Sequence, residues 1–251
     1  MPNKLAKFSA QQMISGLDGQ QLHNEILLRL PRKECTVLFP SLEFIQLSTH
    51  TVLHEANRPI THGYFIDGGL ASFLNTMENG RTVEVGLAGK EGFVGLPLVV
   101  DFSTSPLQVV MQVAGSGFRI RSSYLTQALS VCPELRRELN RFAQIMAMQA
   151  AHVAACNQLH EVDERLARWL LMSQDRLGGD RVPLTQEFLA HMLGTRRASV
   201  TVAAGVLQKR GLIKYTRGDV RVVKRSELEN SACECYQLIV QQSMNWEKES
   251  N

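Results

Sequence analysis

Residues 184–226 read LTQEFLAHMLGTRRASVTVAAGVLQKRGLIKYTRGDVRVVKRS, and this pattern predicts two short helices, a turn and a β-hairpin. Thr185 is a favourable N-cap residue, and Gly194 is expected to end the first helix. Thr195 is then expected to cap the second helix. Helical spacing gives each helix one apolar face, formed by Leu189, Met192 and Leu193 on the first and by Val200, Ala204 and Leu207 on the second.

The second helix carries basic and hydroxyl side chains away from its apolar face. Arg196, Arg197, Ser199 and Thr201 lie at its first turns and on its outer side. A recognition helix presents such residues to the major groove of DNA. The alternative is a small helical subdomain with solvated arginines. Because the turn, the hairpin and the local charge agree with one another, the pattern favours DNA binding.

Charge supports DNA binding locally rather than over the whole chain. The 251 residues have a net charge of only +3. Residues 161–226 contain 13 basic and 7 acidic residues, whereas residues 227–251 contain 1 and 5. Between Gly194 and residue 226, nine basic residues accompany a single acid, Asp219. A basic patch of this kind is typical of a surface that contacts phosphates.

Three stretches carry a resemblance to a known family: RLARWLLMSQDRLGGD (165–180), LTQEFLAHMLGTRRASVT (184–201) and LQKRGLIKYTRGDVRVV (207–223). They resemble the winged helix-turn-helix of the CRP/FNR superfamily of bacterial transcription regulators. The resemblance extends upstream to a β-roll of the cyclic-nucleotide-binding type. It implies a homodimeric regulator that binds double-stranded DNA and works with RNA polymerase, and it implies no enzymatic activity.

The resemblance also implies the fold class and the domain boundaries. The expected fold is α+β, with an N-terminal antiparallel β-roll (jelly roll), a long dimerisation helix and a C-terminal winged helix-turn-helix. The β-roll sensor domain is expected at 1–132, the dimerisation helix at 133–160, and the DNA-binding domain with a C-terminal tail at 161–251. The first helix of the DNA-binding domain is expected at 161–177.

Matching the family position by position assigns base reading to Arg197, often at guanine. The next family position is usually Glu, but here it is Ala198, and a further position that is often Arg is Val202. The DNA target of better-known relatives therefore does not transfer, and we expect Ala198 and Val202 to contact thymine methyl groups. The candidate DNA-contacting residues are Thr185, Gln186, Arg196, Arg197, Ala198, Ser199, Thr201 and Val202, with Tyr215, Arg217 and Arg221 in the predicted wing.

The N-terminal part of the chain is predicted to be rich in β-strands. From about residue 35 to 121, short apolar runs alternate with Gly, Asn and Asp. Two or three strands are expected within 52–74, Asn79-Gly80 indicates a hairpin, and 109–113 reads as another strand. Such spacing is typical of a β-sandwich or barrel. A helix is expected before it, within residues 9–30.

The segment EGFVGLPLVVDFSTSPLQVV (91–110) only partly matches the family's cyclic-nucleotide motif. Leu96 stands where the ribose-binding Glu belongs, and residues 101–106 contain no cation to meet a phosphate. Cyclic AMP is therefore not favoured, and the pocket takes another small-molecule effector, or none if the β-roll is only a scaffold for the dimer. No cofactor is assigned. The candidate pocket residues are Val85, Gly92, Phe93, Gly95, Leu96, Thr104 and Ser105.

The pattern from Pro133 to about residue 158 predicts a long helix. An acid follows the proline, as is common at a helix start. Apolar and small residues then repeat at alternating spacings of four and three, which is typical of a coiled-coil seam between two chains. The alternative is a core helix packed on its own β-roll. A two-fold dimer would imply a palindromic DNA site. The candidate dimer residues are Leu135, Leu139, Phe142, Met146, Gln149, Val153 and Cys156.

Metal and catalytic signals are weak. The oxygen-sensing branch of the family uses N-terminal cysteines, but the first cysteine here, Cys35, stands alone. Cys233 and Cys235 form a pair with no histidine after them, so two ordinary thiols are favoured over a metal site, which usually needs four ligands. No Gly-x-Ser-x-Gly, P-loop or His-Glu-x-x-His motif occurs. No catalytic or metal-binding residue is therefore assigned.

The start of the chain, MPNKLAKFSA, has no apolar run, and no stretch approaches the roughly 20 apolar residues of a membrane span. We therefore expect a cytoplasmic protein with reduced thiols and no membrane partner. The alternative function left open is a nucleotide-binding regulatory module that acts through a protein partner. The basic hairpin and the arginine-bearing helix argue against it.

Overall fold

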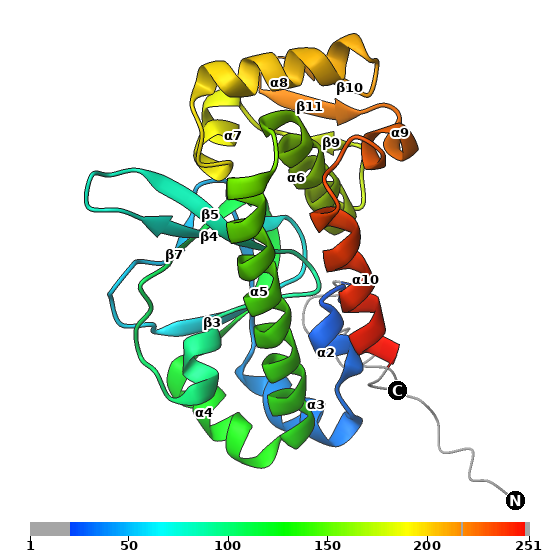
Figure 1. The fold of residues 1–251 in the computed structure, drawn as a ribbon. Coiled ribbons are helices and arrows are strands. Elements are labelled where there is room, and N and C mark those ends of the chain that lie inside the picture. The colour runs from blue at the N-terminus through cyan, green and yellow to red at the C-terminus, as the bar shows by residue number, and fades with distance from the viewer. Residues whose placement is uncertain (1–20, 217, 249–251) are drawn as a thin grey trace, which may run out of the picture.

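The computed structural model describes residues 21–216 and 218–248, and within them two parts lie end to end along one long helix (Figure 1). Two short helices, α2 (Glu25–Arg29) and α3 (Arg32–Leu38), open the described chain. Within the described part of the expected helix at 9–30, only 25–29 are helical, because residues 21–24 are not helical and Pro31 follows closely. Residues 9–20 lie outside the described part.

The β-roll consists of two four-stranded antiparallel sheets, as predicted from the alternating pattern. One has the order β1-β8-β3-β6 and the other β2-β7-β4-β5. Rings of Phe65 and Phe93, 4.7 Å apart between centroids, pack in the core that the roll encloses. The strands are β1 (Glu43–Leu47), β2 (Val52–His54), β3 (His62–Ile66), β4 (Leu70–Thr76), β5 (Thr82–Ala88), β6 (Phe93–Val94), β7 (Gln108–Val113) and β8 (Gly115–Arg121).

The Asn79-Gly80 hairpin joins β4 to β5, as expected. The Met77 N–H donates a hydrogen bond to the Arg81 carbonyl across the turn, and Gly80 has φ +77°, a conformation that favours glycine. Of the two or three strands expected within 52–74, the structure has three, β2, β3 and β4, the last extending to Thr76. This hairpin brings β5 beside the C-terminal part of the chain.

A short helix, α4 (Ser122–Val131), leads into α5 (Pro133–Leu159), which runs along the β-roll (Figure 1). The proline at the first position and the following acid fit the predicted start. The predicted seam, however, faces the chain's own core. Six of its seven side chains are buried within this chain and Met146 is partly buried, so a partner helix cannot reach them.

The core-helix alternative is therefore the right one for that seam. A spacing of four and three gives one apolar stripe, but it does not say which surface covers the stripe. Here the β-roll covers the first half, and α10 packs beside the second half. The residues that are predicted to contact a second chain but pack within this one are Leu135, Leu139, Phe142, Met146, Gln149, Val153 and Cys156.

The C-terminal part has the predicted winged helix-turn-helix order. Its elements are α6 (Val162–Leu177), β9 (Arg181–Val182), α7 (Gln186–Met192), α8 (Arg197–Lys209), β10 (Ile213–Thr216), β11 (Asp219–Val222), α9 (Arg225–Glu229) and α10 (Cys235–Lys248). The strands form a small sheet of order β10-β11-β9. The wing is the β10–β11 hairpin.

Local signals set the ends of these helices. Thr185 Oγ1 accepts a hydrogen bond from the Phe188 N–H at 3.2 Å, so Thr185 caps α7 as predicted. Gly178 and Gly194 follow α6 and α7 in the left-handed conformation. The expected cap at Thr195 is wrong, since α8 begins one residue later with Arg196 as N-cap and no side-chain cap. The Thr195 N–H instead donates to the Ala190 carbonyl and finishes the turn after α7.

No helix in the described residues is long and apolar enough to cross a membrane. The last helix, α10, lies along α5 and α6 and reaches back toward α2 (Figure 1).

Candidate DNA interface, sensor pocket and the contacts between them

The outer face of α8 is open to solvent along its length. Arg196, Arg197 and Ala198 are exposed at its start, and Val202 is 68% exposed one turn later. The inner face is fully packed by Val200, Ala204 and Leu207. This division places the candidate base-reading side chains on one surface and the apolar stripe on the other, as the periodicity predicted.

Residues of α7 and the wing contact α8 at both of its ends. Thr201 donates from Oγ1 to the side-chain oxygen of Gln186 at 2.8 Å. The Tyr215 N–H on β10 donates to the side-chain oxygen of Gln208 at 2.9 Å. Burial raises the pKa of the Tyr215 hydroxyl, while a backbone hydrogen bond at Gln186 and the charge of Arg197 oppose that rise. The helix-turn-helix and the wing are thus fixed to each other as one surface.

The basic residues of this surface fall into two groups. Arg221 is paired with Asp180 at 2.6 Å, Lys224 with Glu227, and Arg225 with Asp175 and Glu229. The remaining cations make no ion pair within residues 21–216 and 218–248; they are Arg196, Arg197, Lys209, Arg210 and Lys214. Arg217, the remaining candidate in the wing, lies outside the described residues. The available positive charge is therefore concentrated on α8 and β10.

A cavity of about 470 Å³ lies between the β-roll and α5. Five of the seven predicted pocket residues line it: Val85, Gly95, Leu96, Thr104 and Ser105. The other two do not. Gly92 and Phe93 belong to the core, where Phe93 packs on Phe65 and the nearest atoms to Gly92 include the ring of Phe142.

The cavity is apolar and nearly uncharged. Its walls include Phe73, Val99 and Val109, and His54 is the single ionisable residue among the described residues that line it. Burial lowers the pKa of His54, whose Nε2 lies 2.9 Å from the His62 carbonyl oxygen. The α5 side of the cavity is formed by Asn140, Ala143, Met146, Ala147 and Ala150. A ligand here would therefore touch the long helix directly.

A buried carboxylate joins the β-roll to the DNA-binding domain. Glu84 on β5 accepts hydrogen bonds from the Trp169 Nε1–H of α6 at 2.8 Å and from the Ser72 hydroxyl at 2.5 Å. Desolvation raises the pKa of Glu84 to about 7, although both hydrogen bonds oppose the shift. Leu70, Leu74 and Leu87 of the roll share one apolar cluster with α6.

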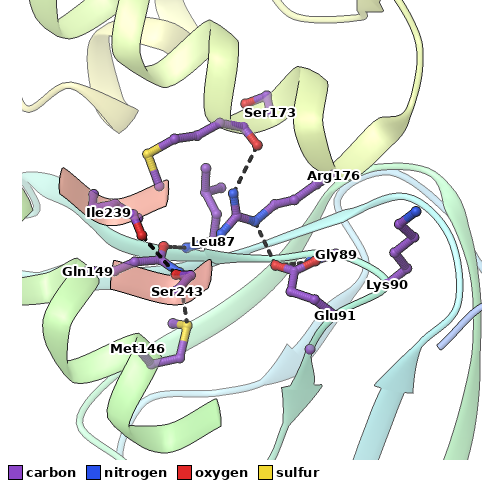
Figure 2. A network of polar contacts seen from close by, with 12 residues as sticks. Leu87, Gly89, Lys90, Glu91, Met146, Gln149, Ser173, Arg176, Ile239 and Ser243 are labelled. Carbon is purple, nitrogen blue, oxygen red and sulfur yellow. Dashed lines mark hydrogen bonds and ion pairs between the residues drawn. The ribbon is translucent and has the colours of Figure 1, made fainter. Parts of the chain in front are cut away.

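A second link lies about two turns further along α6. Figure 2 shows the Arg176 guanidinium reaching from α6 to the Glu91 carboxylate, with Nε 2.7 Å from the oxygen. Nearby, the side-chain oxygen of Gln149 on α5 accepts from the Leu87 N–H at 3.4 Å. Arg165 donates to the Leu193 carbonyl at the end of α7. These contacts hold the helix-turn-helix, α5 and the β-roll together.

Glu84 makes the folding free energy depend on pH. A glutamate in the unfolded chain ionises near 4.5, whereas folded Glu84 keeps its proton until about 7. The folded state thus binds the extra proton between these values, so the free energy of unfolding falls as the pH rises through this window. We expect Glu84→Gln, which cannot ionise, to raise that free energy by about 1–3 kcal/mol at pH 8 and to change it little at pH 4.

The measurement is urea unfolding of wild type and variant at pH 4 to 8. Glu78→Gln is the matched control, because Glu78 is exposed near the tip of the same hairpin. Equal pH slopes for wild type and Glu84→Gln between pH 4.5 and 7 would contradict the assignment.

Several residues in these contacts escaped sequence reasoning. Trp169 falls within the helix expected at 161–177, but neither it nor Glu84 nor Arg176 carries a local signal for its partner. Cys156 was placed in the seam and His160 was not singled out, yet both lie beside Cys233 and Cys235. The spacing of four residues between Cys156 and His160, which puts two side chains on one helix face, was the available signal.

Comparison with known proteins identifies the helix-turn-helix domain. Residues 164–231 match the model of the Crp-like helix-turn-helix domain family. Among curated proteins none matches the chain. Solved structures match over most of it at low identity, and the three named below are covered over nearly their full length.

FixK2 from Bradyrhizobium japonicum superposes with a TM-score of 0.66 at 16% identity, over 76% of this chain and 98% of its own. The c-di-GMP responsive global regulator CLP of Xanthomonas campestris has a TM-score of 0.63 at 16% identity, over 76% and 99%. A CRP/FNR family transcriptional regulator from Thermus thermophilus has a TM-score of 0.62 at 18% identity, over 76% and 98%. At these identities the likeness establishes the fold.

Proposed function

We propose that the chain is a regulator of the CRP/FNR type, which acts as a homodimer and binds a palindromic DNA site under the control of a small apolar effector. Its residues 164–231 match the Crp-like helix-turn-helix domain family, and its fold is like that of FixK2. As a DNA-binding regulator it acts in the cytoplasm. The observation that supports specific DNA binding best is the exposed start of α8, where Arg196 and Arg197 have no acidic partner within the described residues.

The test of this function is selection of random duplex DNA by the purified full-length protein, followed by sequencing. An enriched palindrome is the expected result, since a two-fold dimer presents two α8 helices to two half-sites. If nothing is enriched without a ligand, the selection is repeated with cell metabolite extract. Failure in both conditions would exclude sequence-specific binding.

The chemistry of the pocket supports the proposed class of effector. A phosphate in that cavity would lie among valine, leucine and phenylalanine side chains with no guanidinium or ammonium group among the described lining residues to pair with it. An uncharged, largely apolar molecule carries no charge that would need a cationic partner in this cavity. The cavity of about 470 Å³ lies within the usual range for small-molecule sites.

The exposed side of α5 supports the proposed dimer. Asn140, Gln144, Ala147, Ala151, Ala154 and Gln158 are all exposed, and they too follow spacings of four and three. Small side chains allow two helices to approach closely, because interaxial distance follows side-chain size. A second copy of α5 packed here would cover this face.

A charge placed on this face is expected to break the dimer. In Ala151→Glu, each carboxylate would face the helix of the other chain close to its symmetry mate, and like charges held together at an interface cost several kcal/mol. We expect the dimer dissociation constant to rise by about 10-fold or more. Light scattering during gel filtration measures the mass as a function of concentration.

Gln127→Glu on α4 is the matched control, because it adds the same charge to an exposed helix position away from this face. A wild-type protein that is monomeric at micromolar concentration would exclude the dimer. A dimer equally strong in Ala151→Glu would exclude this face.

Helix α5 contributes both to the lining of the pocket and to the proposed dimer face. Ala143, Ala147 and Ala150 line the cavity, and Ala147 is also on the exposed face. An effector that packs against these residues can shift α5 relative to its partner and so alter the spacing of the two α8 helices. It can do so only through its different affinities for the two arrangements.

A further inference from the structure

Four potential metal ligands from distant parts of the chain meet where the end of α5 lies beside the start of α10. Cys156 and His160 come from the last turns of α5, and Cys233 and Cys235 come from the segment that begins α10. Their ligand atoms all lie within 4.8 Å of one another. The Sγ atoms of Cys156 and Cys233 are 3.3 Å apart, and Cys235 Sγ lies 3.7 Å from His160 Nδ1.

The fold holds these side chains in place from both directions. Cys156 and His160 are four residues apart, so they lie on one face of α5. On the other side, the Tyr236 N–H donates to the Cys233 carbonyl and the Leu238 N–H donates to the Glu234 carbonyl. These hydrogen bonds form the first turn of α10 directly after Cys233. Tyr236 and Ile239 anchor that helix in the apolar cluster of the DNA-binding domain. All three cysteines are buried.

The histidine is already oriented for metal binding. Its Nδ1 faces the sulfur atoms, and its Nε2 lies 3.0 Å from a carboxylate oxygen of Glu234, the residue between the two cysteines. Histidines that bind metals usually donate their second N–H to such a carboxylate, which fixes the tautomer and strengthens the ligand. A pair of idle thiols would not require this arrangement.

The charges around the cluster favour an anionic site. Arg165 and Arg168 on α6 are both buried, the charges of both act on Cys156, and neither forms an ion pair with a carboxylate within the described residues. The charge of Arg168 also acts on the Glu84 carboxylate. A buried guanidinium is costly unless an anion lies nearby. Three thiolates and a neutral histidine around a divalent ion carry one negative charge in total, which offsets part of this positive charge.

We propose that Cys156, His160, Cys233 and Cys235 bind a single divalent zinc-type ion in tetrahedral geometry, with Glu234 positioning the histidine. Zinc prefers sulfur and nitrogen ligands, and bond lengths of about 2.0–2.3 Å place neighbouring donors about 3.4–3.8 Å apart. The separation of 3.7 Å between Cys235 Sγ and His160 Nδ1 lies in this range, and that of 3.3 Å between the Cys156 and Cys233 Sγ atoms is slightly below it. An iron–sulfur cluster binds its thiolates to different iron atoms and so requires more widely separated donors. Calcium and magnesium prefer oxygen.

The ion would tie α10 to the end of α5 where the chain turns into α6. This junction, at His160 and Glu161, is the point at which the DNA-binding domain leaves the long helix. Metal binding therefore fixes the angle between them, and loss of the metal frees it. This consequence for DNA binding rests on the proposed function, whereas the site itself does not.

The experiment is metal titration of the reduced, full-length protein. The protein is first stripped with a chelator, then titrated with Co²⁺, and finally challenged with Zn²⁺. We expect one equivalent of cobalt per chain, visible absorption bands of tetrahedral cobalt with thiolate ligands, and their loss on addition of zinc. Metal analysis of the protein as purified gives an independent stoichiometry.

Matched variants locate the site. Cys235→Ser and His160→Gln are expected to lose the tetrahedral bands, whereas Cys132→Ser, a buried cysteine just before the start of α5, is expected to keep them. Circular dichroism shows whether each variant is folded. Glu234→Gln changes an exposed side chain and should leave the fold intact, yet weaken the metal affinity by about 10-fold in a chelator competition.

Three results would overturn the proposal. The first is wild-type protein that binds no cobalt near one equivalent. The second is equal loss of the bands in Cys132→Ser. The third is a Cys156–Cys233 disulfide, without metal, in protein whose thiols were blocked at cell lysis. Each readout is spectroscopic or chemical and is independent of whether the protein binds DNA.

Discussion

Arg197→Ala is expected to weaken binding to the selected DNA site by about 1–3 kcal/mol, or roughly one to two orders of magnitude. Arg197 is exposed at the start of α8 and has no ion pair within the described residues, so its guanidinium is available for a bidentate contact with guanine. Binding to unrelated DNA should fall much less, because phosphate contacts from the other cations remain. Fluorescence anisotropy with the selected site and a scrambled duplex measures both losses.

Two controls test whether the loss of affinity is specific to Arg197 and to base recognition. Arg137→Ala removes an exposed arginine near the start of α5, at the opposite end of the molecule, and should leave both affinities unchanged. Selection repeated with Arg197→Ala should show relaxed preference at one base position in each half-site. Equal weakening on specific and scrambled DNA would reassign Arg197 to phosphate contact.

Trp169→Ala is expected to lower the free energy of unfolding by about 3–5 kcal/mol. The indole is 1% exposed and lies in the cluster shared by the DNA-binding domain and the β-roll. Its removal leaves a cavity there and takes the Nε1–H donor from the buried Glu84 carboxylate. Urea unfolding followed by circular dichroism measures the change.

Trp169→Phe separates the two effects. Phenylalanine keeps most of the ring packing but cannot donate, so we expect it to lose about 1–3 kcal/mol at pH 8, where Glu84 is ionised. Below pH 5 the loss should be smaller. The surface control is Phe102→Ala, since Phe102 is 66% exposed and its truncation should change stability by no more than about 0.5 kcal/mol. A similar loss for Trp169→Ala and Phe102→Ala would refute the role of Trp169.

The sequence predicts the winged helix-turn-helix well because its signals are local. Thr185 caps α7, Gly178 and Gly194 end their helices, and the inner faces follow the helical period. The strands around Asn79-Gly80 are predicted for the same reason. The predicted cap at Thr195 is wrong because Thr195 and Arg196 are neighbouring candidates for the N-cap of α8, and local signals do not fix the end of a helix to within one residue.

Contacts between distant segments could not be predicted in this way. The stripe through Leu139 and Phe142 says that α5 has an apolar face, but the β-roll rather than a second chain covers it. Gly92 and Phe93 match a family turn, yet the aromatic core takes them away from the cavity. The pairing of Glu84 with Trp169 spans 85 residues and leaves no periodic trace.

The cysteine cluster illustrates the same limit. Cys156 and Cys233 are 77 residues apart, so the pair at Cys233 and Cys235 looks incomplete on its own. Only the return of α10 along α5 supplies the missing ligands.

The ion pairs of the wing also have a consequence for how affinity responds to ionic strength. A cation that is free before binding gains a phosphate and releases the counterions condensed there. Arg221 must first leave Asp180, so part of what it gains from a phosphate is offset by the lost carboxylate. The logarithm of affinity would therefore fall with the logarithm of salt concentration less steeply than a count of nine basic residues implies. The slope reports mainly the unpaired cations of α8 and β10.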